Sequence, residues 1–299
     1  VNGGHPLAIL NPGMLGGKSN FRDRFQRPIE LGDRAVAHQL KKLVAPYLLR
    51  RTKDQVLDEL PSRTDIDVPV SLGPEETSLY EAQRLAALAE LQAGPASAVH
   101  VLAQLTKLRL LACSPRLVVP DFSVPGAKLR VFGEIVDNLI ANGHRVLVFS
   151  QFVKHLTLLR EWLDGKKIPY QYLDGSTPAV RRDQVVETFQ EGEDPLFLIS
   201  PRAGGQGLNL TGADYVVHMD PWWNPAVEDQ ASDRAHRLGQ IRPFTIYRLF
   251  AKGTVEEQIL ALHKTKRSLA AGIIGGADRA GKLSVQKLLE LIKTGLVES

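Results

Sequence analysis

The chain has 299 residues, 43% of them hydrophobic and 23% charged, and 37 Lys and Arg against 33 Asp and Glu give a net charge of +4. This composition is typical of a globular protein with a sizeable core, in one large or two modest domains. Cys113 is the only cysteine, which excludes an intrachain disulfide and a zinc site built on cysteines. No apolar run reaches the roughly 18 residues of a membrane span, and the first residues do not resemble a secretion signal. We expect a soluble intracellular protein with no membrane partner, and the mild positive charge permits a nucleic-acid partner without identifying one.

Roughly the first 120 residues are predicted to be mainly helical. Val36, Leu40 and Val44 recur at helical spacing, and Pro46 is expected to end or kink that helix. Apolar and polar residues alternate over 66–70, which predicts a short strand, and the proline within it favours an edge position. Two further helices are predicted over 74–91 and 97–112.

From about Gly126 the pattern changes to alternating helices and strands. Short, mainly apolar stretches are typical of strands buried on both faces of a parallel sheet. Amphipathic helices lie between them, and Gly143 and Gly165 are expected to end two of these helices. The predicted fold class is therefore α/β, a parallel sheet flanked by helices. The strands are expected at 145–149, 170–173, 196–199, 215–218 and 244–249, and the helices at 129–139, 153–163, 181–189, 254–274 and 283–296.

Gly17-Lys18-Ser19 matches only the end of a phosphate-binding loop. That loop needs G-x-x-x-x-G-K-[ST], whose backbone N–H groups wrap the phosphates. Its first glycine would stand where the chain has Pro12, which has no N–H and a fixed φ. An apolar strand ending in acidic residues, which would hold Mg²⁺, has its nearest match at 56–59, but polar residues precede it. We expect no complete nucleotide and Mg²⁺ cradle in this chain.

The densest group of polar residues lies in the last third of the chain. A glycine-rich loop with Gly205 and Gly207 follows an apolar strand, and such a loop suits either close approach to a phosphate or a simple turn. Arg234 and Arg237 stand three residues apart on an expected helix end, where both guanidiniums can point the same way. Paired arginines suit the charge of a transferring γ-phosphoryl group. A solvated basic helix is the alternative.

Five segments occur in a fixed order: LVFSQF at 147–152, LDGST at 173–177, RAGGQGLNL at 202–210, DPWWNP at 220–225 and DRAHRLGQ at 233–240. Together they resemble motifs IV to VI of the Snf2 family of superfamily 2 DNA translocases. Earlier segments resemble the family's stretch after motif III and its connecting helices, so the resemblance covers nearly the whole chain. Each motif alone is weak, but the ordered set is specific.

The resemblance implies the C-terminal RecA-like half of an ATP-driven motor. In this family two RecA-like lobes enclose ATP, and the first lobe carries the Walker elements and holds most of the ATP with its Mg²⁺. By resemblance, Arg234 and Arg237 are arginine fingers that reach the γ-phosphate, while Gly205, Gly207 and Gln230 shape the nucleotide side of the cleft. The implied partner is the N-terminal RecA-like lobe of the same full-length chain.

The resemblance also implies three regions. Residues 1–122 would form a helical protrusion and linker, 123–275 the RecA-like lobe, and 276–299 a C-terminal helix. The helix from Thr254 onward would be a brace that packs back on the lobes.

Duplex DNA is the implied nucleic-acid partner, held by its phosphates because translocation cannot depend on sequence. The residues that the resemblance places on the DNA-facing rim are Gln151, Ser176, Thr177, Arg182, Arg202 and Trp222. Of the pair Trp222 and Trp223 we expect one ring to pack and one to make contact. Pro201 stands where the commoner family form has Thr, and it removes an N–H and a hydroxyl from the loop. No metal site is predicted, and His218 and His236 are expected to be polar packing or cleft residues.

Three alternatives remain open: a strand-separating superfamily 2 helicase lobe, a non-catalytic DNA- or protein-docking module, and a remodeller of RNA polymerase. The missing Walker elements suggest a piece of a longer protein that is inactive alone. The expected location is the cytoplasm, with the nucleoid, in a prokaryote, or the nucleus in a eukaryote.

Overall fold

A computed structural model describes residues 18–30, 33–44, 60–93, 97–201, 203, 208–237, 239–272 and 285–293. The chain divides into two compact units, Val1–Asp58 and Glu59–Ser299. The described part of the first unit is helical, as predicted, and Lys18 and Ser19 of the incomplete loop motif lie in its first helix. Its elements are α2 (Lys18–Phe21), η1 (Arg22–Gln26), α3 (Arg27–Glu30) and α4 (Arg34–Val44). Pro46 lies outside the described residues.

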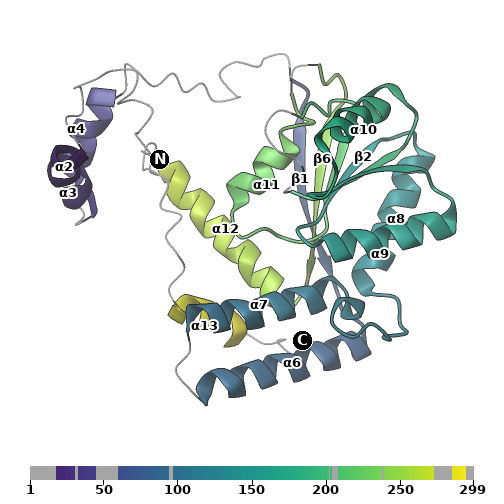
Figure 1. The fold of residues 1–299 in the computed structure, drawn as a ribbon, viewed down its shortest axis with the longest axis horizontal. Coiled ribbons are helices and arrows are strands. Elements are labelled where there is room, and N and C mark those ends of the chain that lie inside the picture. Colours follow the sequence, from purple (N-terminus) through teal and green to yellow (C-terminus); the bar gives the residue numbers. More distant parts are fainter. Residues whose placement is uncertain are drawn as a thin grey trace. The chain divides into compact units, whose positions relative to one another are not determined.

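The second unit is built on a parallel sheet (Figure 1). Among the described residues six strands pair in the order β1-β6-β5-β2-β4-β3, and every neighbouring pair is parallel. All residues of β2 and β4 are buried, as expected for central strands covered on both faces. The predicted α/β fold with a helix-flanked parallel sheet is confirmed. The strands are β1 (Arg63–Val70), β2 (Val146–Phe149), β3 (Tyr170–Leu173), β4 (Leu196–Ile199), β5 (Tyr215–His218) and β6 (Phe244–Ala251).

Strand β1 lies at one edge of the sheet, as the proline within it predicted. It pairs along its whole length with β6, from Arg63 opposite Phe244 to Val70 opposite Ala251. This strand comes from the range 1–122 that the resemblance gave to the protrusion and linker. The sheet of the lobe is therefore completed by a segment that precedes residue 123.

Two pairs of helices cover the two faces of the sheet (Figure 1). On one face, α8 (Ala127–Ala141) and α9 (Val153–Lys166) pack against alternate residues of the central strands. On the other face, α10 (Ala179–Glu191) and α11 (Pro225–Ser232) do the same. Buried residues of the first core include Phe132, Val136, Leu156, Leu163, Val148 and Leu198, and those of the second include Phe189, Ala231, Leu147, Phe197 and Ile246.

A third apolar cluster joins helices that are far apart in the sequence. It is formed by α6 (Pro74–Gln92), α7 (Ala98–Cys113), α12 (Val255–Gly272) and α13 (Val285–Lys293). The Tyr80 hydroxyl accepts a hydrogen bond from the backbone N–H of Val255 at 2.8 Å, which ties α6 to the start of α12. The predicted helix from Thr254 is confirmed, and its role as a brace on another lobe stays a prediction. None of the helices described here has both the length and the apolar character needed to cross a bilayer.

Two glycines were expected to end helices, and only one does. Gly143 has φ +71° just after α8, and the N–H of His144 donates to the Leu139 carbonyl, so the helix ends in a left-handed turn as predicted. The prediction that Gly165 ends its helix was wrong, because α9 continues to Lys166 and the residue with left-handed backbone is Lys167, at φ 58°. Its last carbonyls are taken up by the N–H groups of Lys167 and Ile168.

Candidate functional site

Most of the residues predicted to contact DNA follow strands of the series β5-β2-β4-β3 in the sheet. Gln151 comes after β2, Ser176 and Thr177 after β3, and Trp222 after β5. The carboxyl ends of parallel strands lie along one edge of the sheet. The segments after β5 and β2 are therefore adjacent there, and the segment after β3 lies one strand further on, beyond β4. Arg202, after β4, lies outside the described residues.

The loop after β3 is a compact, hydrogen-bonded turn. The carboxylate of Asp174 accepts from the hydroxyl of Ser176 at 2.6 Å, and the hydroxyl of Thr177 closes the same turn. Although burial alone raises the pKa of Asp174, hydrogen bonds from Ser176, Tyr172 and Thr177 hold it below its usual value. Arg182 folds back from α10 and donates to the carbonyl of Thr177 at 2.8 Å. Ser176, Thr177 and Arg182 are thus brought together, with Ser176 exposed.

The side chain of Gln151 is engaged inside the protein. Its amide nitrogen donates to the carboxylate of Asp220 and to the carbonyl of Pro221, both at 3.0 Å. Asp220 is fully buried and also accepts from the hydroxyl of Ser150 at 2.5 Å. Both amide hydrogens of Gln151 therefore have partners, and the remaining oxygen is an acceptor that a phosphate does not favour. The amide of Gln151 therefore holds the 220–221 segment in this structure, and its predicted contact with a DNA phosphate stays a prediction.

The two adjacent tryptophans have different environments. Trp222 is only 3% exposed, and its ring packs edge-on against Phe149 and His218. It is a core residue, which corrects the prediction that placed it on DNA. Trp223 is half-buried, and the guanidinium of Arg109 lies 5.2 Å from its ring centroid. Of the pair, only Trp223 leaves part of its ring accessible.

Arg109 lies next to this segment, although no sequence motif indicates it. This side chain of α7 is 4% exposed, lies over the ring of Phe152 as well as that of Trp223, and donates to the Pro221 carbonyl at 2.9 Å. A cation stacked on aromatic rings is favourable, especially where it is shielded from water. The helical layer thus supports the 220–223 segment directly. The only sequence signal was an arginine at an inward position of a helix.

Arg234 and Arg237 lie beyond the end of α11, and not on a helix as predicted. The helix ends at Ser232, and the chain continues in tight turns, with the N–H of Arg237 donating to the Ala235 carbonyl. The Arg234 carbonyl accepts from the N–H of Leu210 at 2.9 Å, which attaches the turn to the segment before β5. We call residues 233–237 the arginine turn.

The arginine turn is closed by Gly239 and Gln240. Gly239 has φ +101°, a conformation that residues with a side chain rarely adopt. The Gln240 amide donates to the carbonyls of Ala213 and Thr211, at 2.7 and 3.2 Å. The backbone that carries both arginines is therefore fixed to the sheet core at each end.

The guanidinium of Arg234 is half-buried and short of partners. Its Nη1 atom is buried without a hydrogen bond, and neither Arg234 nor Arg237 forms an ion pair with any residue that the structure describes. Burial lowers the pKa of Arg234, and no carboxylate compensates for it. Arg237 and Gln230 are exposed. A buried, uncompensated cation is costly, so this arrangement favours an anion from outside the chain.

The remaining glycines of the predicted site cannot be placed, and the two histidines noted in the sequence make internal contacts. Gly205 and Gly207 lie outside the described residues. His218 contacts the hydroxyl of Ser232 at 2.8 Å, and burial lowers its pKa to about 4. His236 contacts the Pro61 carbonyl at 2.9 Å and stacks on Phe244.

Three buried side chains have ligand atoms within 4.8 Å of one another: Cys113, His155 and Asp220. Asp220 is already engaged by Ser150 and Gln151, and the ammonium of Lys128 acts electrostatically on all three groups. A nearby positive charge opposes a dication. We therefore assign no metal to this cluster.

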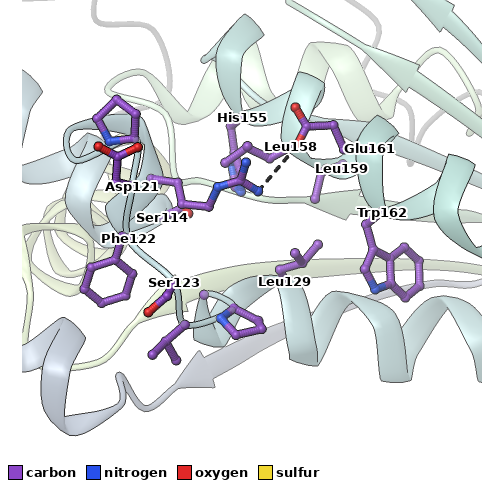
Figure 2. A pocket seen from close by; sticks show the side chains of 15 residues that line it. Ser114, Asp121, Phe122, Ser123, Leu129, His155, Leu158, Leu159, Glu161 and Trp162 are labelled. Atoms are coloured by element: carbon purple, nitrogen blue, oxygen red, sulfur yellow. Dashed lines mark ion pairs between the residues drawn. The ribbon is translucent and has the colours of Figure 1, made fainter.

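One pocket of about 480 Å³ lies where the segment 114–126 meets α8 and α9 (Figure 2). Its wall includes His155, Leu129 and Trp162, and an ion pair of 3.3 Å joins Arg116 to Glu161 across it. It contains none of the residues predicted for ATP or DNA.

Two family descriptions match adjoining parts of the chain. The SNF2-related domain matches residues 6–117, and the helicase conserved C-terminal domain matches residues 127–239. The two matched regions follow each other along the chain, and the second contains most of the ordered motifs between residues 147 and 240. The chain belongs to the Snf2 family.

Curated relatives match almost the whole chain. An uncharacterized ATP-dependent helicase of Mycoplasma genitalium is 35% identical over 289 residues, which cover 94% of this chain and 27% of the relative. The human SWI/SNF-related matrix-associated actin-dependent regulator of chromatin subfamily A member 1 is 31% identical and covers 97% of this chain and 30% of the relative. The chain thus spans about a quarter to a third of these curated relatives.

A solved Snf2 structure has the same fold. The Sulfolobus solfataricus SWI2/SNF2 ATPase core in complex with dsDNA aligns with a TM-score of 0.66 and 30% identity, covering 96% of this chain and 63% of that chain. The match includes the helical layer as well as the sheet, since it extends over nearly all residues.

Proposed function

We propose that this chain is the C-terminal ATPase lobe of a Snf2-type motor that couples ATP hydrolysis to movement on duplex DNA and to remodelling of protein–DNA complexes. Membership of the Snf2 family supports the ATPase class. The finer assignment rests on one observation, the arginine turn. There the half-buried guanidinium of Arg234 has a buried nitrogen without a partner, and Arg237 stands three residues further on.

The chemistry of the arginine turn fits the γ-phosphate of ATP. Two guanidiniums on a fixed backbone can donate to the phosphate oxygens, where charge develops during phosphoryl transfer. Arg234 is already desolvated, so its attraction to an anion is stronger than in water. Gln230, exposed on α11, and the glycines Gly205 and Gly207 would line the same side of the cleft. Mg²⁺ would enter with ATP and be held mainly by the N-terminal RecA-like lobe of the longer protein.

Duplex DNA would be held at the carboxyl ends of the strands. The hydroxyl of Ser176, the Thr177 turn and the guanidinium of Arg182 form a polar group that suits backbone phosphates. Trp223 takes the contact role first given to Trp222, since its ring is the accessible one of the pair. The Sulfolobus neighbour, solved in complex with dsDNA, supports this choice of polymer.

The proposed cycle alternates between a closed and an open cleft. ATP on the N-terminal lobe would attract the arginine turn and close the cleft. Water would split ATP into ADP and phosphate, and release of the phosphate would remove the charge that the arginines share, so the lobes would separate. Each closure would shift the DNA-phosphate contacts of one lobe relative to those of the other lobe. Strand separation is not needed for such a step.

Arginine substitutions in the full-length protein test this function. Arg234→Ala or Arg237→Ala is expected to lower DNA-stimulated ATPase turnover by about 10³-fold or more, the range seen when an arginine finger is lost. Duplex binding, measured by anisotropy at fixed salt, is expected to persist, because the contacts to DNA lie on other segments.

Arg116→Ala is the matched control. Among the described residues Arg116 forms an ion pair only with Glu161, and its side chain is 42% exposed. Its turnover should equal that of the wild type. Wild-type turnover in both Arg234→Ala and Arg237→Ala would refute the assignment.

A further inference from the structure

One charged side chain interrupts the apolar pattern of a central strand. Arg248 lies in β6, opposite His218 of β5 and Asp67 of β1, and it is 3% exposed. Phe244 and Ile246 of the same strand belong to the core beneath α11. Since side chains alternate along a strand, Arg248 points to the same face as these two residues, where an apolar side chain would fill the space without any partner.

Arg248 joins two elements that are not neighbours in sequence. Its Nε donates to Glu228 of α11 at 2.5 Å, and its Nη2 donates to Asp65 of β1 at 2.6 Å. Asp229 of α11 lies 3.5 Å from the same Nη2. Although burial alone lowers the pKa of Arg248, these carboxylates raise it, so the guanidinium stays charged. The guanidinium fork therefore holds α11 against the edge strand.

A second arginine repeats this connection at the other end of the helix. Arg63 of β1 pairs with Asp65 at 2.9 Å, with Asp229 at 3.2 Å and with Asp233 at 3.4 Å. Asp65 and Asp229 are thus shared by both guanidiniums. Asp233 directly precedes Arg234, so this contact reaches the arginine turn itself.

The first turn of α11 is connected to the DNA side of the proposed site. The second oxygen of Glu228 accepts from the backbone N–H of Trp222 at 3.3 Å, while the first is held by Arg248. Asn224 caps the helix by accepting from the N–H of Ala226. The eight residues of α11 therefore separate the tryptophan segment from the arginine turn, and Arg248 contacts the helix through Glu228.

We propose that Arg248 is a positioning residue that fixes α11 against β1, so that Trp223 and the arginine turn move as one rigid element. This inference rests on the proposed function, because the two ends of α11 matter together only in a DNA-dependent ATPase. Shifts of about 1 Å in a reacting group can cost about 100-fold in rate. The hydrogen bonds of Arg248 to Glu228 and Asp65 thus set the position of both ends of α11.

The test uses the full-length protein and measures kcat and KM for ATP with and without duplex DNA. Arg248→Lys keeps the charge and its attraction to Glu228, but a single ammonium cannot hold Glu228 and Asp65 in the fork geometry. We expect DNA-stimulated kcat to fall by about 10- to 100-fold, with KM for ATP changed by less than about 3-fold. Asp65→Asn, at a partly exposed position, should lower kcat in the same direction.

A double variant separates positioning from stability. Arg248→Met combined with Glu228→Leu removes both charges of the buried pair, and such apolar replacements often leave folding stability unchanged. If Arg248 serves only stability, this folded variant will have wild-type kcat. We expect a folded protein, verified by thermal melting, whose DNA stimulation is lost.

The outcomes distinguish the two proposals. Wild-type kcat and DNA stimulation in folded Arg248→Lys and Asp65→Asn would overturn the positioning role, while an inactive Arg234→Ala in the same assay would leave the proposed function standing. A full-length wild type without DNA-stimulated ATPase would overturn both. Should Arg248→Lys fail to fold, Asp65→Asn and the double variant decide.

Discussion

Replacing Lys128 with Met is expected to destabilise the second unit strongly. The ammonium of Lys128 in α8 pairs with Glu256 at the start of α12, and both side chains are 0% exposed. Lys128 also donates to the Met219 carbonyl at 2.8 Å, and Glu256 accepts from the N–H of Ala251 at 2.8 Å. This pair joins α8 to the end of β5 and the end of β6, so its loss removes contacts from all three elements.

The size of the effect follows from burial. Removing one partner of a buried ion pair leaves an uncompensated charge and costs about 3–5 kcal/mol. In a unit of this size that lowers Tm by about 6–20 °C. The exposed pair of Lys166 and Asp137, with side chains 42% and 50% exposed, is the comparison. Its loss should cost no more than about 1 kcal/mol.

Urea unfolding of the 299-residue chain measures both effects. The double variant Lys128→Met and Glu256→Leu removes the charges but leaves the Met219 carbonyl and the Ala251 N–H without partners, at about 1–3 kcal/mol each. Its total loss should therefore lie well below the sum of the single losses. If the single losses add to within about 0.5 kcal/mol, the two groups are not coupled and the reasoning is refuted.

Two further predictions concern pH and glycine. Burial lowers the pKa of His155 to about 3 and that of His218 to about 4, whereas an unfolded histidine titrates near 6.5. The unfolded chain therefore binds more protons, so stability is complete above about pH 6.5 and falls below it by about 1.4 kcal/mol per pH unit for each histidine; equal urea midpoints at about pH 7 and about pH 5 would contradict this. Gly133→Ala should destabilise by about 1–3 kcal/mol, because its new Cβ would lie 2.8 Å from the ring of Trp162. Gly165→Ala in α9, with nothing within 4 Å, should instead stabilise by about 0.5–1 kcal/mol, and thermal melts of the two variants should shift in opposite directions.

Local patterns predicted the sheet and most of its helices because strand and helix periods are written in neighbouring residues. The strands at 146–149, 170–173, 196–199 and 215–218 were expected almost to the residue. Pro69 also placed β1 at an edge correctly, because proline removes a ladder donor. The partner of β1 was not predictable, since it lies far along the chain.

The errors at the site came from contacts between distant residues. The hydrogen bonds of Gln151 could not be predicted locally, because its partner Asp220 lies 69 positions away. The different environments of Trp222 and Trp223 also involve distant residues. Arg109 lies over the ring of Trp223, and the ring of His263 contacts the Trp222 carbonyl at 2.5 Å. A local pattern holds no information on which of two adjacent rings meets such partners.

The role of Arg248 was hidden for a related reason. Within the stretch 244–249 it looked like an ordinary polar residue of a strand. Only the strand order, which sets β6 between β1 and β5, shows that this position is central and needs carboxylate partners.

The pairing of β1 with β6 has a consequence for synthesis on the ribosome. About 180 residues separate the paired positions Arg63 and Phe244. At roughly 5–20 residues per second, β1 waits about 10–35 seconds for its partner strand. During that time its open edge can attract other chains, and Asp65, Asp67 and Pro69 are the kinds of residue that discourage such pairing. We therefore expect the charges along β1 to limit such pairing in the nascent chain, in addition to their contacts in the finished protein.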